Sequence, residues 1–170
     1  LADQALAIAT EQQGPGSPKA LEAALELGLT HQAAGHAELA ESRLREFVAA
    51  WNQRSPSSPE AIVGMNCLGD LLLRQGRLDE AATLLKDAEQ RGLGVLPEAA
   101  ALRPRGSVAE LVKQQALSAA RAGRSSEATT LFGDAAGRFE ALLADERRLL
   151  GPAPLDVGRT RANFAPGLWP

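Results

Sequence analysis

The sequence of 170 residues is poor in aromatic side chains and in cysteine. Phe and Trp together make up 4% and Tyr is absent, whereas apolar residues reach 45%. Such a core consists mainly of Ala and Leu, which favours closely packed helices over a sheet, because strands are enriched in β-branched and aromatic residues. The single cysteine, Cys67, excludes an internal disulfide and is compatible with a reducing compartment, and we favour an intracellular location.

Long apolar runs and clusters of basic residues are also missing. No uninterrupted run approaches the roughly 18 apolar residues that a membrane-spanning helix needs. The 18 Lys and Arg residues are spread along the chain among 21 Asp and Glu residues, which gives a net charge of −3. A nucleic-acid-binding protein usually carries a concentrated basic patch. We therefore expect neither a transmembrane segment nor a nucleic-acid partner.

The residue combinations of an active site or a metal site are not evident in the sequence. His31 and His36 are the two histidines, and a spacing of five does not place them on one helix face as a zinc pair. Cys67 has no histidine nearby in sequence and fits a small core residue. Glycines stand at turns and connectors, not between a strand and a helix as in a phosphate-binding loop. We predict that the protein is not an enzyme and uses no metal or cofactor.

One stretch recurs three times with its residues in step. In each copy a glycine is followed after five residues by an alanine and after four more by a large apolar residue. A small residue stands 12 positions before each alanine, at Gly28, Gly69 and Ala116. The copies are Gly35, Ala40 and Leu44; Gly76, Ala81 and Leu85; and Gly123, Ala128 and Phe132. Self-similarity at 41 and then 47 residues indicates a repeat protein.

Each copy is predicted to be a helix hairpin. A glycine between two apolar helical stretches supplies the turn, and small residues let two helix backbones approach closely. Prolines lie between hairpins, where they start or stop helices. The predicted units are a helix remnant at 1–12, hairpins at 18–54, 60–91 and 108–150, an inserted loop at 92–107, and the start of a fourth hairpin at 155–165. Because 1–12 fits the second helix of a hairpin, we expect the chain to be part of a longer protein.

The repeat resembles the tetratricopeptide repeat (TPR). The matching residues of the second unit are Leu68, Gly69, Gly76, Glu80, Ala81, Leu85 and Ala88. The period exceeds the roughly 34 residues of the common repeat, and the connectors are similar to those of the kinesin-light-chain-like branch. The segments that carry this likeness are Ala5-Leu6-Ala7-Ile8, Gly14-Pro15-Gly16-Ser17-Pro18, and 159–165. The resemblance implies an all-α, right-handed α-solenoid of antiparallel helix hairpins that binds a protein or peptide partner.

In stacked hairpins the first helices line the concave side, where a partner would bind. With Gly69 as the register, the polar candidates are Asn66, Asp70 and Arg74 in the second unit, and Lys113, Gln114 and Arg121 in the third. By resemblance, Asn66 and Asn163 match an asparagine pair of the kinesin-light-chain branch, whose amides can pair with the backbone of an extended peptide. The alternative is that Asn66 is a solvated polar residue on a helix. Trp169 near the end of the chain either caps the solenoid or anchors in a neighbour.

The insertion at 92–107 has two interpretations. It is punctuated by Gly and Pro and can hold a short turn of helix at 98–102. Either it is a plain longer connector, or it contacts a partner through Val95 and Leu96 or through Arg103 and Arg105.

Three hypotheses for function follow. The first is a non-catalytic interaction module, or adaptor, that binds a peptide in the concave groove. The second is a structural subunit or scaffold of a larger assembly, in which the convex face, the insertion and the ends are buried by neighbours. The third is the recognition arm of a longer enzyme or regulator whose catalytic part lies outside this chain.

Overall fold

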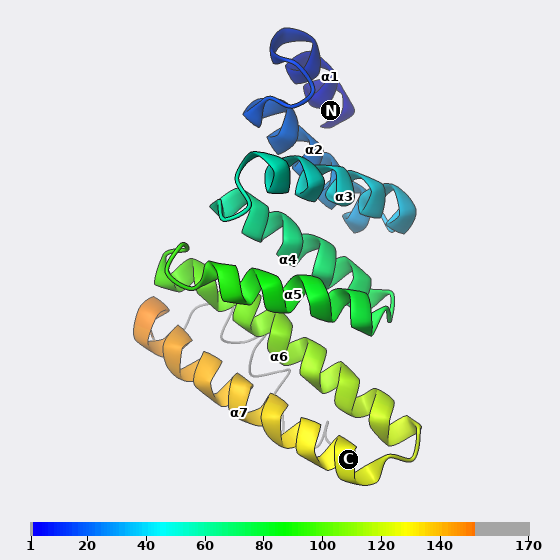
Figure 1. Cartoon of the computed structure of the whole chain (residues 1–170), viewed down its shortest axis with the longest axis vertical. Coiled ribbons are helices and arrows are strands. Elements are labelled where there is room, and N and C mark those ends of the chain that lie inside the picture. The colour runs from blue at the N-terminus through cyan, green and yellow to red at the C-terminus, as the bar shows by residue number, and fades with distance from the viewer. Residues whose placement is uncertain (1, 152–170) are drawn as a thin grey trace.

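The computed structural model describes residues 2–151. Over this range the chain forms seven helices and no strand, and the helices stack one after another along the long axis (Figure 1). Their bounds are α1 Ala2–Gln13, α2 Pro18–Ala33, α3 Ala37–Arg54, α4 Pro59–Arg74, α5 Leu78–Gly92, α6 Glu98–Arg121 and α7 Ser125–Leu150. Helix α1 packs on α2, and the pairs α2–α3, α4–α5 and α6–α7 form hairpins. The prediction of an all-α solenoid of helix hairpins is confirmed, while the segment 155–165 lies outside the described residues.

The three hairpin turns share one structure. Each has a glycine with positive φ, at 79° in Gly35, 76° in Gly76 and 75° in Gly123. This left-handed conformation disfavours residues that carry a Cβ. The residue after each glycine donates its N–H to the carbonyl five residues earlier, which satisfies the end of the first helix. The bonded pairs are His36 with His31 at 2.9 Å, Arg77 with Leu72 at 3.0 Å, and Arg124 with Ala119 at 2.9 Å.

The first two hairpins also begin alike. The side-chain oxygens of Ser17 and Ser58 accept hydrogen bonds from the backbone N–H groups of Ala20 and Ala61, at 3.2 and 3.1 Å. A proline occupies the first position of α2 and of α4, where its missing N–H removes no helical hydrogen bond. The Ser-Pro pair therefore fixes where each of these helices starts.

Close helix contacts in the first two hairpins depend on glycines in α4. A Cβ at Gly64 would lie 2.5 Å from the Phe47 ring of α3, and one at Gly69 would lie 2.5 Å from the Leu85 side chain of α5. Real Cβ contacts are not that short, so both positions require the smallest residue. Helix α4 is accordingly buried on most of its surface, and it also contacts α6 directly.

The third hairpin begins ten residues earlier than predicted, which corrects the inserted loop at 92–107. Helix α6 starts at Glu98, so the connector from α5 is short. The prediction gave too much weight to Pro104 and Gly106 as helix breakers. Pro104 does remove one helical hydrogen bond, but Pro104 and Leu102 are buried in the helix. Apolar burial of these side chains offsets the missing bond.

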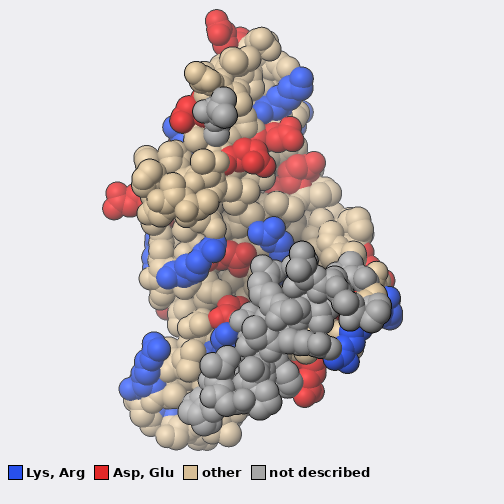
Figure 2. Space-filling view, turned by 180° about the vertical axis from the view of Figure 1, so that it is seen from behind, with Lys and Arg blue, Asp and Glu red and all other residues tan. Residues whose placement is uncertain are grey.

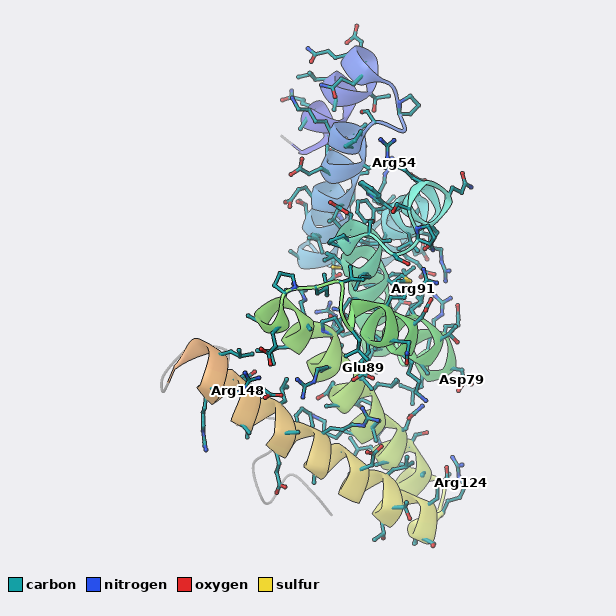
Figure 3. All side chains as sticks on the ribbon, turned by 60° about the vertical axis from the view of Figure 1, so that its left-hand side comes forward. Arg54, Asp79, Glu89, Arg91, Arg124 and Arg148 are labelled. Atoms are coloured by element: carbon teal, nitrogen blue, oxygen red, sulfur yellow. The ribbon has the colours of Figure 1, made fainter. Side chains whose placement is uncertain are left out.

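Ion pairs hold the added length of α6 against α7, which is two residues longer, at 26 against 24. Arg105 Nη1 lies 2.7 Å from Asp145 Oδ2, and Arg148 reaches back to Glu98 at the start of α6 (Figure 3). Hydrogen bonds from Arg105, and then from Arg148, hold the pKa of the Asp145 carboxyl group below its usual range. The bond from Arg148 likewise lowers the pKa of Glu98. Residues 98–107, which were predicted to belong to a loop, are thus part of the hairpin.

A second ion-pair network joins α3 to α5. Arg77 lies 2.7 Å from carboxylate oxygens of both Glu41 and Glu80, and Arg45 contacts the same two carboxylates at 2.8 and 3.1 Å. Burial opposes ionisation of Glu41, but the hydrogen bonds from Arg77 and Arg45 outweigh it and lower the pKa of this carboxyl group. The network therefore clamps the second helices of adjacent hairpins.

Candidate partner-binding face

The first helices of the hairpins, α2, α4 and α6, provide the surface that we call the first-helix face. Six of the predicted contact residues lie on two of these helices: Asn66, Asp70 and Arg74 on α4, and Lys113, Gln114 and Arg121 on α6. The two other predicted residues, Asn163 and Trp169, lie outside the described residues. The structure therefore allows the α4 and α6 parts of the predicted site to be considered.

Asn66 is buried in this face and carries an unsatisfied group. The residue is 2% exposed, which is inconsistent with a solvated polar side chain. Its Nδ2 donates to Asp70 Oδ2 at 3.2 Å, whereas its Oδ1 has no hydrogen-bond partner. A buried acceptor without a donor costs about 1–3 kcal/mol. A ligand that displaces the atoms now covering Oδ1 and supplies an N–H group would recover that cost.

A cavity of about 70 Å³ lies beside Asn66, between α4 and the N-terminal half of α6. Its lining residues are Ile62, Val63, Asn66, Leu96, Ala100, Arg103 and Pro104. The three from α6 belong to the early part of that helix, which the sequence predicted as a loop. Sequence reasoning pointed to Leu96 and Arg103 as alternative contacts but missed Ile62, Ala100 and Pro104. The helix-forming residues 98–103, which directly precede Pro104, were the available signal.

Three arginines offer positive charge on α4 and α6. Arg74 and Arg121 lie in the last turns of these helices, and Arg103 lines the cavity. All three are exposed, and none forms an ion pair with another residue between positions 2 and 151. Arg105, the other predicted contact of the insertion, is instead bound to Asp145. Arg74 and Arg121 also complement the negative ends of their helix dipoles, which is a structural role of their own.

Lys113 and Gln114 are engaged within α6. Lys113 Nζ lies 2.6 Å from Glu110 Oε2 and 5.9 Å from the centre of the Phe139 ring. Gln114 Nε2 donates to Glu110 Oε1 at 2.8 Å. These contacts fix both side chains and occupy part of their hydrogen-bonding capacity. They are therefore weaker candidates for partner contact than Asn66 and the three arginines.

Charge is unevenly distributed on the side of the molecule shown in Figure 2. Acidic side chains gather over its upper, N-terminal part beside a few basic ones, and both signs are also present below. Glu22 and Glu26 are exposed residues of α2, whereas the unpaired arginines belong to α4 and α6. An acidic ligand segment is therefore better matched to α4 and α6 than to α2.

The two histidines and the cysteine do not form a metal site or a nucleophilic site within residues 2–151. The rings of His31 and His36 have centroids 5.8 Å apart at the first turn, but no group of three metal-ligating side chains is present in this range. Cys67 is buried, and burial raises the pKa of its thiol, so the reactive thiolate is disfavoured. No helix in the described range has the length and apolar character to cross a membrane.

Comparison with known proteins identifies the fold. No family model matches the sequence, and no curated protein matches it either. Two crystal structures of a kinesin light chain from Podosopora anserina with nearly identical TPR-like repeats, one carrying a substitution, do match. They share 17% and 18% identity with TM-scores of 0.71 and 0.69, and each alignment covers 96% of this chain and 72% of the other. The chain has a TPR-like fold.

This identification explains the recurring residues. In the TPR-like hairpins of this chain, the in-step glycines form the turns, and the in-step alanines Ala40, Ala81 and Ala128 are buried. TPR-like folds generally mediate protein–protein interaction through surfaces that differ from one protein to the next. The specificity of this chain must therefore be argued from its own side chains.

Proposed function

We propose that this chain is a non-catalytic interaction module that holds an extended peptide segment of a protein partner against α4 and α6. The observation that carries the proposal is Asn66, a buried asparagine whose Oδ1 has no partner. A buried polar group without a partner lowers stability. An extended peptide supplies backbone N–H groups, which are the donors that this oxygen lacks.

The positive charge on the same helices supports a peptide with acidic residues. Arg74 and Arg121 are exposed at the ends of α4 and α6, and neither has an ion-pair partner in the described range. Unpaired guanidinium groups can take carboxylates with two hydrogen bonds each. Such contacts would raise the association rate of the peptide and the specificity of the binding that Asn66 supports.

The proposal is tested by selecting binders from a random peptide display library and measuring their affinity for two matched double variants. Arg74→Glu with Arg121→Glu reverses two charges on first helices. Lys86→Glu with Arg147→Glu reverses two exposed charges on the second helices α5 and α7. We expect the first variant to weaken binding by about tenfold or more and the second to leave it within a factor of about two. Equal losses in both variants would contradict the proposal.

A second candidate function is that of a structural subunit in a larger assembly. Leu39 on α3 and Leu93 after α5 are 54% and 62% exposed, and large exposed apolar side chains suit a permanent interface. Affinity purification with a salt wash separates the two functions, because structural interfaces bury far more surface. A stoichiometric set of large partners that is lost in Leu39→Ser with Leu93→Ser would favour the subunit. Weak clients that are lost in salt would favour the peptide-binding module.

The recognition-arm hypothesis concerns the parent protein. It adds a catalytic domain elsewhere and leaves the proposed role of this chain unchanged. The full coding sequence, which either contains such a domain or does not, tests it directly.

A further inference from the structure

We infer that the cavity between α4 and α6 is a specificity pocket for one branched aliphatic side chain of the bound peptide, with an acidic residue next to it. This inference rests on the proposed function, because it names the peptide feature that α4 and α6 would select. Three properties of the cavity support it: its size, the unsatisfied acceptor of Asn66 and its charge.

Size selects an aliphatic side chain. The cavity has a volume of about 70 Å³, roughly half of the ~150 Å³ of an engineered apolar cavity that admits benzene. An isopropyl or sec-butyl group therefore fits, whereas a phenyl or indole ring does not. Ile62, Leu96 and Pro104 provide apolar walls, and Val63 is 39% exposed. Filling the cavity would remove this exposed apolar surface from water.

An unsatisfied acceptor favours a peptide backbone over a plain hydrocarbon as the bound group. Asn66 Oδ1 lacks a donor. Ala100 also lines the cavity, and its carbonyl lacks the usual helical donor four positions later, because that residue is Pro104, which has no N–H. The unsatisfied acceptor that the structure records here is therefore Asn66 Oδ1, and the Ala100 carbonyl is short of its usual helical hydrogen bond. An extended peptide that inserts a side chain here brings N–H donors with it.

Charge selects the neighbouring residue. Arg103 lines the cavity and is exposed, and it has no ion pair with any residue in the described range. Glu98, the acidic residue closest to it along α6 on the N-terminal side, is occupied by Arg148. A carboxylate from the peptide would therefore meet a guanidinium group that is not already neutralised. Together these features predict Leu, Ile or Val next to Asp or Glu.

The test uses capped dipeptides as defined probes and NMR spectroscopy of the full chain as the readout. N-acetyl-Leu-Asp-methylamide is expected to bind with a Kd on the order of 1 mM. It should shift the methyl signals of Ile62, Val63 and Leu96 and the side-chain amide of Asn66. N-acetyl-Trp-Asp-methylamide should leave these signals unchanged, and N-acetyl-Leu-Lys-methylamide should bind several-fold more weakly.

Two substitutions on α6 provide a matched pair. Ala100→Leu fills the cavity from an exposed position, and Ala99→Leu adds the same side chain at an exposed neighbour outside the cavity. Both keep a strong helix former, so both are expected to fold. Ala100→Leu should abolish the shifts, and Ala99→Leu should retain them. Arg103→Gln should remove the preference for Asp over Lys while Leu still binds.

The outcomes separate the pocket from the wider proposal. Display-selected peptides that bind Ala100→Leu and wild type equally would overturn the pocket and leave the peptide-binding face intact. Dipeptide binding to the cavity, combined with a failed selection of longer peptides, would support the pocket and contradict the proposed function. Absence of any shift at 10-fold excess over the expected Kd would also overturn the pocket.

The same NMR spectra test two other occupants of the cavity. Cavity signals that move on 10-fold dilution of the chain, without probe, would show that a second copy fills the pocket. Cavity signals that move in Leu155→Ser or Leu168→Ser, without probe, would show that the chain's own C-terminal segment fills it. Either result would overturn the peptide as occupant.

Discussion

The second and third hairpins pack the same repeat with different side chains. In α4, Gly64 and Gly69 leave no room for a Cβ, because Phe47 and Leu85 lie directly over the backbone. In α6, Ala116 stands where α4 has Gly69 and is fully buried. In α7, a Cβ added at Gly133 or at Gly137 would have no other atom within 4 Å. Glycine is therefore a packing requirement in the second hairpin and a dispensable residue in the last helix.

Length provides a second contrast between these hairpins. Helix α4 starts at a Ser-Pro cap and has 16 residues, whereas α6 lacks such a cap and extends to 24. The additional turns of α6 carry Ala100, Arg103 and Pro104, which complete the cavity beside Asn66. The extension of α6, which departs from the repeat pattern, therefore supplies three of the residues that line the cavity on this surface.

The largest effect is expected from Phe47→Ala. Phe47 is 2% exposed, covers Gly64 and has its ring centroid 6.4 Å from that of Trp51. Loss of this ring should lower the free energy of unfolding by about 3–5 kcal/mol. Urea denaturation followed by circular dichroism measures it. A loss below about 1 kcal/mol would show that the first two hairpins do not depend on this contact.

Gly64→Ala should cost about 1–3 kcal/mol, because its Cβ would overlap the Phe47 ring. The decisive comparison is the same substitution in the Phe47→Ala background. There the overlapping ring atoms are gone and Val48 Cγ2 at 3.2 Å is the contact that remains, so alanine should cost far less than in wild type, and the double-mutant cycle should show a coupling well above 0.5 kcal/mol. Additive effects of the two substitutions would contradict the close packing of α3 on α4.

Gly137→Ala tests the other side of the comparison. Its new Cβ meets nothing within 4 Å, and alanine is favoured over glycine in a helix interior by about 0.5–1 kcal/mol. We therefore expect the urea midpoint to rise by a corresponding small amount. A destabilised Gly137→Ala variant would mean that α7 is packed as tightly as α4.

The smallest effect is the loss of stability in acid. Glu41 and Glu80, clamped by Arg77 and Arg45, have pKa values lowered from an ordinary 4.5. A carboxyl group with a lowered folded-state pKa contributes its stability above the unfolded pKa and loses it as the pH falls through the folded one. The urea midpoint should therefore stay level from pH 7 to about 5 and fall below about 4.5, less steeply in Glu41→Gln. A midpoint that rises on acidification would oppose the ion-pair account.

Much of the fold follows from short-range patterns in the sequence. Positive φ at Gly35, Gly76 and Gly123 makes the hairpin turns local features, and the Ser-Pro caps make two helix starts local as well. The first two hairpins of the structure span 18–54 and 59–92, beside predicted bounds of 18–54 and 60–91. The start of α6 escaped prediction because it depends on tertiary contacts, namely burial of Pro104 and the pairing of Arg105 with Asp145.

The candidate site was predictable only in part, for the same reason. The repeat register placed Asn66 on the first helix of its hairpin, but its burial and its unsatisfied oxygen depend on surrounding helices. Lys113 and Gln114 were predicted from register too, yet each is bound to Glu110, a neighbour on the same helix. The repeat register predicts on which helix face a residue lies, whereas the freedom of its side chain to bind a partner depends on the neighbouring side chains.

The most direct test of the central claim is amide hydrogen exchange of the full chain, alone and saturated with a display-selected peptide. The account predicts added protection in α4 and α6, greatest from Glu98 to about Glu110, with little change in α3 and α5. Protection confined to α3, α5 or the exposed end of α5 near Leu93 would contradict a peptide-binding first-helix face and favour the second-helix side as the interface.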